Sequence, residues 1–469
     1  MYCELEVCRQ MESALKEYLN SLKGKRTAVI GLGVSNMPLV ERLLDAGVSV
    51  LACDKRRREE FGGIIERLES RGLETALGPD YLDHLDGVKV IFRTPGLRPD
   101  VPQIAKAVAE GARLTSEMEA FLSLCPCRII AVTGSDGKTT TTTIIAGMLR
   151  AAGYRTFVGG NIGNPLLCQV DEIRPDDMVV LELSSFQLLT MRQSASIAVV
   201  TNLAPNHLDV HKDMEEYVSA KRNIFAYQDA CDQLVLNADN EITSGFAREA
   251  RGRVTLFSRK KTLERGVYLK DGMILYCGRP ILHGEDILLP GAHNLENYMA
   301  AIAVVEDLVP DEVIRSFART FGGVPHRIEL VRELDGVRYY NDSIASSPSR
   351  TIAGLRSFQQ KVILIAGGYD KHIPYDALGP EVVEHVQALL LTGDTAEKIK
   401  AAVLAAPGYE RGKPDMEDCA DLRQAVERAR ALAQPGDVVI MSPASASFDR
   451  FKNFEERGNA FKDLVNALK

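Results

Sequence analysis

Short apolar runs alternate along this chain with longer segments whose apolar residues recur at helical spacing. The run "RTAVIGLG" at 26–33 ends in glycines, and "MPLVERLLDAG" at 37–47 has the spacing of an amphipathic helix. The runs "VSVLACD" and "VKVIFRTPG" predict further strands, and "PQIAKAVAEG" predicts a helix. Strands that alternate with helices indicate a parallel, doubly wound α/β sheet.

The same pattern returns twice further along the chain. The strands "RIIAVTG" and "DMVVLEL" and a long helix over 214–228 are followed by "VYLKDGMILY", where Asp-Gly between alternating segments predicts a hairpin. The helix "NLENYMAAIAVVEDL" closes this second block. Beyond it, "KVILIAGGYD", "VQALLLTGD" and "DVVIMSPASAS" predict strands that end in small or polar residues.

We therefore predict three α/β domains. Residues 1–126 form an N-terminal Rossmann-like domain with an extra helix at about 10–22. Residues 127–323 form a central domain with a parallel sheet and a small antiparallel sheet, and residues 324–469 form a C-terminal Rossmann-like domain. Ligands of such sheets bind at the carboxyl ends of the strands.

Composition narrows the class of protein. The chain has 469 residues, a net charge of -8 and 45% hydrophobic residues, which suits large globular cores. The longest basic run is "DKRRR", so we expect no nucleic-acid partner. We also expect no membrane association and a cytoplasmic location, because neither a membrane-length apolar run nor a signal core is present. The nine scattered cysteines are interpreted as reduced thiols.

The segment "AVTGSDGKTT" indicates a phosphate-binding loop that is shorter than the usual P-loop. It stands between a predicted strand and a predicted helix, where backbone N–H groups cradle phosphate oxygens. Lys138 would neutralise phosphate charge and the Thr139 hydroxyl would bind Mg²⁺. A tight turn with a capping threonine is the alternative interpretation.

Several other polar residues follow strands of the same block. Glu182 ends an apolar strand, where a buried acid needs a cation, although a solvated carboxylate is the alternative. His207 is either a structural histidine or a metal ligand, and we interpret His211 as a surface residue. Pattern alone describes Lys221 as a solvated lysine within a helix.

The N-terminal turn "GLGVSN" carries half of a dinucleotide-binding fingerprint. Asp54 follows the next strand about 20 residues later, which suits recognition of a ribose hydroxyl. Asn36 stands where the third glycine is expected, so the fingerprint is incomplete. A nicotinamide dehydrogenase is the natural interpretation of this turn alone, but it leaves the phosphate loop without a use.

Together these motifs resemble the Mur ligase family, whose members make amide bonds at the expense of ATP. The resemblance covers the chain from about residue 26. It is carried, in order, by "TGSDGKTT", "GGNIG" at 159–163, "LELSSFQL" at 181–188, "TNLAPNHLDVH", "AKRNIF", "LPGAHNLEN" and "PHRIE". "LELSSFQL", "NDSIAS" at 341–346 and "SPASASFDRFKNFEERG" at 442–458 resemble the member that adds D-glutamate to UDP-N-acetylmuramoyl-L-alanine.

The resemblance implies the cofactors ATP, two Mg²⁺ ions and CO₂, the last as a carbamate on Lys221. The catalytic and metal-binding residues would be Lys138, Thr139, Glu182, His207 and carbamylated Lys221. ATP would contact Gly134, Ser135, Asp136, Gly137, Lys138, Thr139, Thr140, Asn294, Asn297, Arg327 and Asp342. The UDP substrate would contact Val34, Ser35, Asn36, Asp54, Arg56, Thr94, Gly96 and Asn161, and D-glutamate would contact Ser346, Lys371, Ser447 and Phe454.

Ile344 departs from the family, because many relatives have lysine in this segment, and a charge contact there does not carry over. We expect a monomer whose partners are these small molecules. Three alternatives remain open at this stage: a related ligase with another amine or folate substrate, a nicotinamide dehydrogenase, and a nucleotide-binding switch without chemistry.

Overall fold

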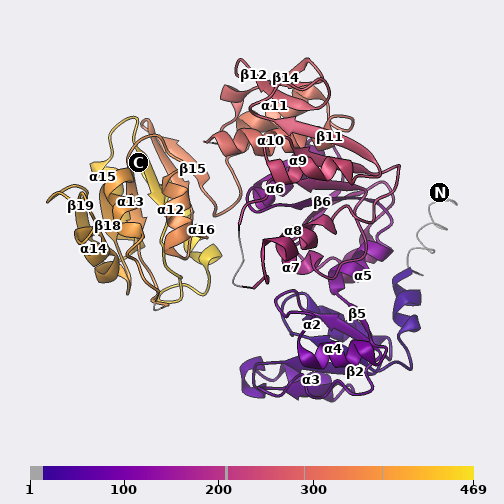
Figure 1. Ribbon diagram of the computed structural model, residues 1–469. Coiled ribbons are helices and arrows are strands. Elements are labelled where there is room, and N and C mark those ends of the chain that lie inside the picture. The colour runs from indigo at the N-terminus through magenta and orange to yellow at the C-terminus, as the bar shows by residue number, and fades with distance from the viewer. Residues whose placement is uncertain (1–13, 206–209, 290, 372) are drawn as a thin grey trace. The chain divides into compact units, whose positions relative to one another are not determined.

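The computed structural model describes residues 14–205, 210–289, 291–371 and 373–469 (Figure 1). The chain divides into two compact units, Met1–Gly284 with Leu295–Phe317 and Glu285–Asn294 with Ala318–Lys469. The first unit contains a five-stranded and a nine-stranded sheet, and the second contains a six-stranded sheet. The predicted α/β class with three domains is confirmed. Among the helices of the described ranges, none has the length and apolar character needed to cross a bilayer.

The N-terminal sheet is parallel throughout, with strand order β3-β2-β1-β4-β5. Its strands are β1 (Thr27–Ile30), β2 (Val50–Asp54), β3 (Glu74–Leu77), β4 (Val90–Arg93) and β5 (Arg113–Thr115). Its helical elements are α2 (Asn36–Asp45), η1 (Arg58–Phe61), α3 (Ile64–Glu69), α4 (Pro102–Ala109) and α5 (Glu117–Leu124).

Alternate residues of each strand in this sheet enter different cores, because successive strand side chains point to opposite faces. Val29 packs in the same cluster as Leu39 of α2, whereas Ile30 packs in the same cluster as Ile104 of α4. Residues 14–21 form an additional helix whose Leu15 joins the first of these clusters. The predicted N-terminal helix is thus confirmed where it is described; residues 10–13 lie outside the described ranges.

The central sheet has the order β14-β13-β12-β11-β10-β9-β6-β8-β7, with β6 between the parallel strands β9 and β8. Its strands are β6 (Arg128–Thr133), β7 (Thr156–Gly160), β8 (Met178–Glu182), β9 (Ile197–Val200), β10 (Gln233–Asn237), β11 (Arg253–Ser258), β12 (Val267–Lys270), β13 (Met273–Tyr276) and β14 (Arg279–His283). The helices that follow in sequence are α6 (Lys138–Ala151), η2 (Leu167–Glu172), α7 (Ser185–Leu188), α8 (Met214–Arg222), α9 (Glu241–Gly245), η3 (Phe246–Arg248), η4 (Gly284–Asp286), α10 (Ala292–Val305) and α11 (Asp311–Thr320).

The predicted Asp-Gly hairpin joins β12 to β13. Asp271 and Gly272 both have positive φ, 49° and 76°, as the favoured two-residue hairpin turn requires. The antiparallel strands β12 to β14 continue the parallel sheet, since β12 pairs in parallel with β11.

The helix predicted over 214–228 is wrong in length, because α8 ends at Arg222. Asn223 ends it by making tertiary contacts: its side-chain amide donates to the Leu188 carbonyl at 2.9 Å and its carbonyl accepts from Ser194 at 3.0 Å. Helical spacing of apolar residues continues beyond this point, but contacts with distant segments determine the end of the helix.

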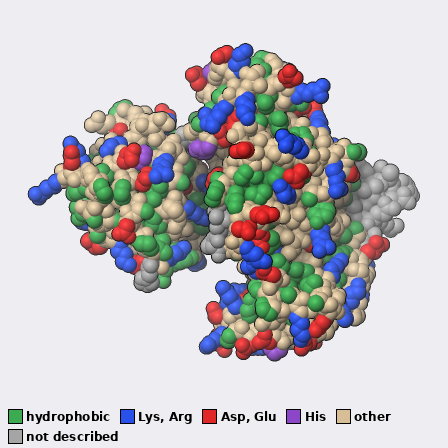
Figure 2. Space-filling view, viewed as in Figure 1, with side chains coloured by type: hydrophobic (Ala, Val, Ile, Leu, Met, Phe, Trp, Pro, Cys, Tyr) green, Lys and Arg blue, Asp and Glu red, His purple; other side chains and the backbone are tan. Residues whose placement is uncertain are grey.

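The C-terminal sheet has the order β15-β16-β20-β17-β18-β19, and only β15 runs antiparallel to its neighbour. Its strands are β15 (Glu329–Leu334), β16 (Val337–Asn341), β17 (Val362–Ala366), β18 (Val386–Leu391), β19 (Asp415–Asp418) and β20 (Val438–Met441). Its helices α12 (Pro348–Leu355), α13 (Leu378–His385) and α14 (Ala396–Leu404) contribute to one core, and α15 (Leu422–Leu432) and α16 (Phe454–Ala467) to the other. On the face shown in Figure 2, acidic and basic side chains are interspersed over the surface of each unit.

Candidate active site

The shortened phosphate loop links β6 to α6 and depends on two glycines. Gly134 has φ +154°, and a Cβ there would lie 1.9 Å from the Thr201 hydroxyl oxygen. Gly137 has φ +77°, and a Cβ there would lie 2.4 Å from the side-chain oxygen of Asn297. Both positions therefore exclude any side chain, so the loop backbone approaches its neighbours as closely as a phosphate cradle requires.

The N-terminus of α6 provides the anion-binding end of this loop. The N-cap residue of this 14-residue helix, Gly137, has no side chain to cap it, and the positive end of the helix dipole suits an anionic ligand. The N–H groups of Ser135 and Asp136 instead donate to Asn202, at 2.9 Å each. The Lys138 ammonium donates to the Gly134 and Ser135 carbonyls at 2.9 and 2.8 Å, which holds its charge at the loop.

Glu182 ends β8, the strand next to β6, and its side chain is buried. The residue is 1% exposed, and its Oε1 accepts a 2.7 Å hydrogen bond from the Asn161 amide. Its Oε2 is buried without a hydrogen-bond partner among the described protein atoms. A carboxylate oxygen buried in this way needs a cation or a donor from outside the chain, so the solvated-carboxylate interpretation is wrong.

Lys221 projects from α8 to the same strand ends. Its ammonium donates to the Thr133 hydroxyl at 3.1 Å and to the Gly134 carbonyl at 2.9 Å, and the residue is 1% exposed. Burial, reinforced by the charge of Lys138, lowers the pKa of Lys221 well below its ordinary value. The solvated-lysine interpretation is therefore wrong, and a buried amine with a lowered pKa lies beside the phosphate loop.

Tyr217 connects the same helix to the loop a second time. Its hydroxyl exchanges a 2.9 Å hydrogen bond with Ser135, and its ring lies 4.9 Å from the Lys221 ammonium. Ser135 also donates to the Ala204 carbonyl at 2.9 Å. Protein groups therefore engage both the side chain and the backbone N–H of Ser135, and its predicted ATP contact stays a prediction.

Two histidines follow β9. His207 lies outside the described residues, so its predicted metal-binding role stays a prediction. The interpretation of His211 as a surface residue is wrong, because it is 2% exposed and stacks on the Phe186 ring at 5.2 Å. Its Nε2 lies 2.9 Å from the Ser185 hydroxyl, and burial lowers its pKa. A lone histidine in the sequence gives no sign of these tertiary contacts, because its partners lie about 25 residues away along the chain.

The remaining predicted ATP-binding residues divide between the two units. Asn297 lies beside Gly137 and accepts from the Thr141 hydroxyl at 3.2 Å, within the first unit. Asn294, Arg327 and Asp342 belong to the second unit, so their approach to ATP stays a prediction. Within that unit Asp342 is 4% exposed, and burial raises its pKa to about 7 although Ser442 donates to it at 2.7 Å.

Asp54 organises the N-terminal turn. It accepts hydrogen bonds from the backbone N–H of Leu32 at 2.7 Å and from the Arg56 side chain at 3.0 and 3.1 Å. Burial raises the pKa of Asp54, but the hydrogen bonds from Arg56 and Leu32 outweigh it and lower the pKa below its ordinary value. Arg56 also donates to the Leu32 carbonyl at 2.9 Å, so this ion pair closes the turn around it.

Asn36, which stands where the fingerprint has its third glycine, makes hydrogen bonds that only a side chain can supply. Its buried amide donates to the Ile30 and Gly31 carbonyls at 3.1 and 2.9 Å, which ties the turn to β1. Thr94 lies against Gly31, where a Cβ would be 2.7 Å from the threonine methyl. The other predicted contacts of the UDP substrate on this side, Val34, Ser35 and Gly96, are exposed and available to a ligand.

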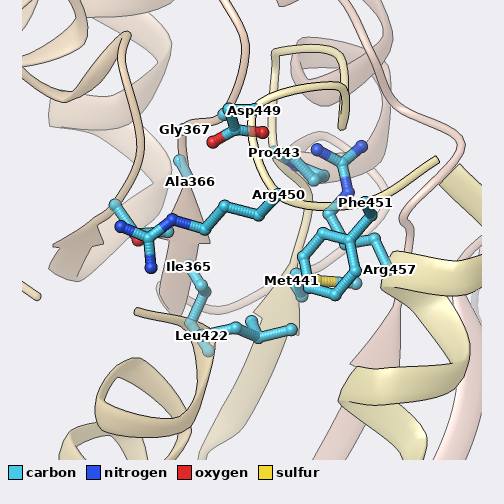
Figure 3. A pocket seen from close by; sticks show the side chains of 12 residues that line it. Ile365, Ala366, Gly367, Leu422, Met441, Pro443, Asp449, Arg450, Phe451 and Arg457 are labelled. Carbon is cyan, nitrogen blue, oxygen red and sulfur yellow. The ribbon is translucent and has the colours of Figure 1, made fainter. Parts of the chain in front are cut away.

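In the second unit, the predicted amino-acid contacts follow three neighbouring strands. Ser346, Lys371 and Ser447 come after the carboxyl ends of β16, β17 and β20, and Phe454 begins α16. A pocket at this edge is lined by other residues, including Gly367, Thr392, Asp449, Arg450 and Arg457 (Figure 3).

Arg457 is a buried cation that the motif contained but that sequence reasoning did not single out. It donates to the carbonyls of Ser343, Ser445 and Ala446 at 2.9 to 3.1 Å. Burial lowers its pKa to about 10. This guanidinium holds together the loops that follow β16 and β20, which carry Ser346 and Ser447.

The strand–loop–helix unit and the α/β sheets define a three-domain protein of the P-loop nucleotide-binding class. The sequence matches the Mur ligase MurD-like N-terminal domain over residues 25–116, the Mur ligase middle domain over 132–305, and the Mur ligase glutamate ligase domain over 326–445. The chain therefore belongs to the Mur ligase family.

Relatives of nearly equal length support this assignment. A "UDP-N-acetylmuramoylalanine--D-glutamate ligase" of Acetivibrio thermocellus is 55% identical over 465 residues, covering 98% of this chain and 100% of the relative. A protein of the same name from Clostridium novyi is 50% identical over 466 residues with the same coverage.

Solved structures of the family share the fold at low identity. UDP-N-acetylmuramate-alanine ligase MurC from Thermotoga maritima has a TM-score of 0.56 at 19% identity, covering 95% of this chain and 100% of that one. MurF ligase from Thermotoga maritima in complex with ADP has a TM-score of 0.51 at 17% identity, covering 95% of this chain and 96% of that one. These likenesses concern the fold alone.

Proposed function

We propose that this protein is an ATP-dependent ligase that joins D-glutamate to UDP-N-acetylmuramoyl-L-alanine, a step in the synthesis of peptidoglycan precursors in the cytoplasm. The observation that carries the chemical class is the meeting of Lys138, Glu182 and Lys221 at adjacent strand ends around one phosphate loop. The identity of the substrates rests on the relatives that bear this name and match over their whole length.

The reaction has two steps. The γ-phosphoryl group of ATP passes to the free carboxylate of the UDP substrate, which gives an acyl phosphate and ADP. The amine of D-glutamate then attacks the acyl carbon, the C–O bond to phosphate breaks, and the amine loses a proton as the amide forms. The loop and Lys138 stabilise charge on the phosphoryl group, so positioning and electrostatics supply most of the catalysis.

The donor set around the loop fits Mg²⁺. Glu182 supplies a buried carboxylate oxygen without a protein partner, and Thr139 stands in the first turn of α6. No group of three or more His, Cys, Asp or Glu converges among the described residues, and magnesium beside phosphates needs only one or two carboxylates. Bound Mg²⁺ would neutralise the charge that develops on the phosphates. We propose Thr139 and Glu182 as ligands of one ion, and His207 with Lys221 for a second.

Lys221 would serve that second ion as a carbamate. Carbamylation needs a neutral amine, and burial together with the neighbouring Lys138 lowers the pKa of Lys221 in the required direction. The carbamate presents two oxygens, the ligand type that magnesium prefers. Thr133 links the two segments, because it receives a hydrogen bond from Lys221 and donates one to the carbonyl of Leu183, the residue after Glu182.

The outer domains would bind the two substrates. We assign the turn around Asp54 and Arg56 to the UDP group, together with Val34, Ser35, Asn36, Thr94 and Gly96. The strand ends that carry Ser346, Lys371, Ser447 and Phe454 are assigned to D-glutamate. We also assign Asn161 of the central domain to the UDP substrate; its side-chain amide orients Glu182 through a 2.7 Å hydrogen bond. We propose that the enzyme acts as a monomer.

The deciding experiment measures ADP release with ATP, Mg²⁺ and UDP-N-acetylmuramoyl-L-alanine, with and without D-glutamate. We expect release that depends on both substrates and a product whose mass contains glutamate. A panel of other amino acids and folate decides between D-glutamate and another amine. Nucleotide binding without substrate-dependent ADP release would instead indicate a switch, and NAD(H) binding with hydride transfer would indicate a dehydrogenase.

A further inference from the structure

Arg93 secures the turn at 94–97 of the N-terminal domain from inside. This arginine ends β4, is 2% exposed, and donates to the carbonyls of Thr94 and Pro95 at 3.2 and 3.0 Å, and also to that of Leu97. Its other terminal nitrogen donates to the Phe186 carbonyl of α7 at 3.0 Å. The turn that carries Thr94 and Gly96 is thus attached to the element that follows Glu182.

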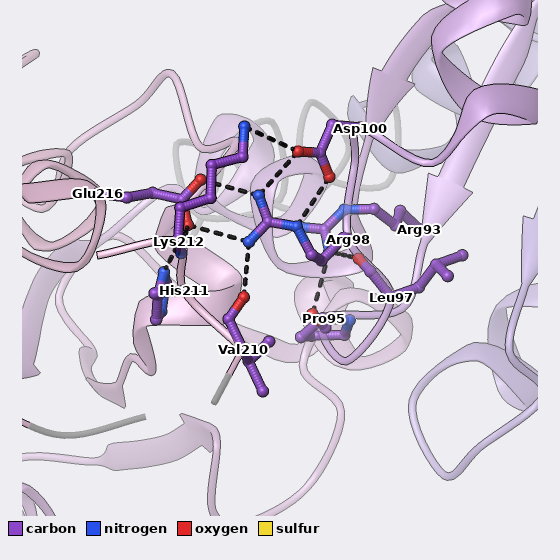
Figure 4. Close-up of polar contacts among 9 residues, drawn as sticks. All are labelled: Arg93, Pro95, Leu97, Arg98, Asp100, Val210, His211, Lys212 and Glu216. Carbon is purple, nitrogen blue, oxygen red and sulfur yellow. Dashed lines mark hydrogen bonds and ion pairs between the residues drawn. The ribbon is translucent and has the colours of Figure 1, made fainter. Parts of the chain in front are cut away.

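Arg98 attaches the same turn to α8 (Figure 4). Its two terminal nitrogens donate to both carboxylate oxygens of Glu216, at 2.9 and 2.8 Å, and one also donates to the Val210 carbonyl at 2.7 Å. Asp100 binds the other edge of the guanidinium, with both contacts at 2.8 Å. A bidentate pair of this kind specifies direction as well as attraction, and a lysine does not reproduce it.

Glu216 also contacts His211. The carboxylate lies 3.3 Å from His211 Nδ1 and accepts from the Lys212 backbone N–H at 2.9 Å. The His211 ring in turn contacts Ser185 and stacks on Phe186, the residue whose carbonyl Arg93 holds. The contacts form a closed circuit through β4, the turn, α8 and α7. The pKa of Glu216 is lowered to about 2, mainly because Arg98 donates hydrogen bonds to its carboxylate.

Two further residues of α8 contact the phosphate loop. Tyr217 follows Glu216 directly and bonds to Ser135, and Lys221, five residues beyond Glu216, bonds to the Gly134 carbonyl. An α-helix transmits a displacement of its first turn along its whole length, because each turn is hydrogen-bonded to the next. α8 thus connects the contact with Arg98 to the groups that hold Ser135 and Gly134.

We propose that Arg98 is a positioning residue that couples substrate binding at the turn at 94–97 to nucleotide binding at the phosphate loop, through Glu216 and α8. The inference rests on the proposed function, since it takes the turn to be part of the UDP-substrate site. Arg98 itself contacts neither the nucleotide nor the substrate. Its effect is an energetic coupling between two sites, which is reciprocal and measurable by binding alone.

The test is the affinity for a non-hydrolysable ATP analogue with Mg²⁺, measured by calorimetry with and without saturating UDP-N-acetylmuramoyl-L-alanine. We expect the substrate to change the affinity of the wild-type protein by about fivefold or more. In Arg98→Gln this ratio should fall to about 1, and in Arg98→Lys it should be intermediate, since the charge remains and the fork is lost. Arg67→Gln is the matched control, because Arg67 is an exposed arginine of the same domain paired with Glu41.

Glu216→Gln provides a second route to the same coupling and serves if Arg98→Gln does not fold. The affinity ratio of the double variant should be no lower than that of either single variant, because both substitutions remove the same contact between Arg98 and Glu216. A residue with a merely structural role would lower the melting temperature and leave the ratio unchanged, and that result overturns the inference, as does a wild-type ratio of 1. If the wild-type protein does not bind the UDP substrate at all, the proposed function itself fails.

Discussion

The side-chain amide of Asn161 donates a 2.7 Å hydrogen bond to Oε1 of Glu182, while Oε2 of the same carboxylate is buried without a hydrogen-bond partner in the described protein. The Asn161 backbone N–H also donates to the Glu182 carbonyl at 2.8 Å. The glycine turn before Asn161 makes this approach possible, since a Cβ on Gly160 would lie 2.1 Å from that carbonyl oxygen. The carboxylate is therefore held in one orientation, with one oxygen buried and without a partner among the described protein atoms.

Glu182→Gln should separate activity from stability. We expect activity to fall at least about 100-fold, because several kcal/mol of metal-based charge stabilisation is lost. The melting temperature should stay unchanged or rise, because a buried and incompletely paired charge is removed while the bond from Asn161 remains possible. Glu66→Gln, at a side chain that is 54% exposed, is the control. Full activity in Glu182→Gln would contradict the metal-binding role.

Lys138→Ala tests the phosphate loop. The ammonium is the positive charge held at the loop by the Gly134 and Ser135 carbonyls, so its removal should lower kcat/KM for ATP by about 100-fold or more. The measurement is substrate-dependent phosphate release. Lys270→Ala removes an exposed lysine at the end of β12 and should behave as wild type. Phosphate release that survives Lys138→Ala unchanged would show that the loop does not bind the triphosphate.

Lys221→Ala tests the proposed carbamate. We expect activity to be lost and then partly restored by added acetate, whose two oxygens occupy the space of the missing carbamate. Lys221→Arg should be inactive in the absence of acetate, since a guanidinium stays protonated and does not react with CO₂. The readout is ADP release against acetate concentration. Full activity of Lys221→Ala without acetate would remove the carbamate from the mechanism.

Asp342 should make the stability of the second unit depend on pH. Burial raises its pKa in the folded state to about 7, above the ordinary 3.8. The native state therefore holds the proton to higher pH than the unfolded state does, so stability falls as pH rises from about 4 to about 7 and levels off above that range. The slope for one group is at most about 1.4 kcal/mol per pH unit.

Asp342→Asn should flatten this pH dependence. The measurement is calorimetric unfolding between about pH 4 and about pH 8, which covers the interval of falling stability and the plateau above it. The wild-type melting temperature should drop across the interval more than that of Asp342→Asn. Asp418→Asn, at a side chain that is 52% exposed, should follow the wild-type profile. Identical profiles for all three proteins would mean that Asp342 ionises normally in the folded state.

Local pattern was sufficient for the phosphate loop and poor for its partners. Gly134, Gly137 and Lys138 are recognisable because a glycine turn between an apolar strand and a helix has one well-known use. The occupants of the surrounding space come from distant segments, as Asn202 and Asn297 show. The same limit misled the interpretation of His211, whose contacts with Ser185 and Phe186 span about 25 residues of sequence.

Arg93 and Arg98 illustrate what sequence reasoning passed over. A lone arginine at the end of the apolar strand "VKVIFR" is a signal of a buried, multiply hydrogen-bonded cation, because an unpaired one would be costly. Nothing in that signal identifies Phe186 or Glu216 as partners. The pairing depends on how two domains of the first unit fold against each other, which residue spacing along the chain does not encode.

By itself, the sequence determined the alternation of strands and helices, the glycines of the turns and the presence of a phosphate loop, because periodicity and backbone sterics act between residues that are close along the chain. Its motifs also determined the family. Only the tertiary structure decided that Lys221 is buried against the Gly134 carbonyl, that one oxygen of Glu182 has no protein partner, and that Arg98 holds α8. Hydrogen bonds and burial arise between segments that folding brings together, and their strength depends on the solvent that folding removes.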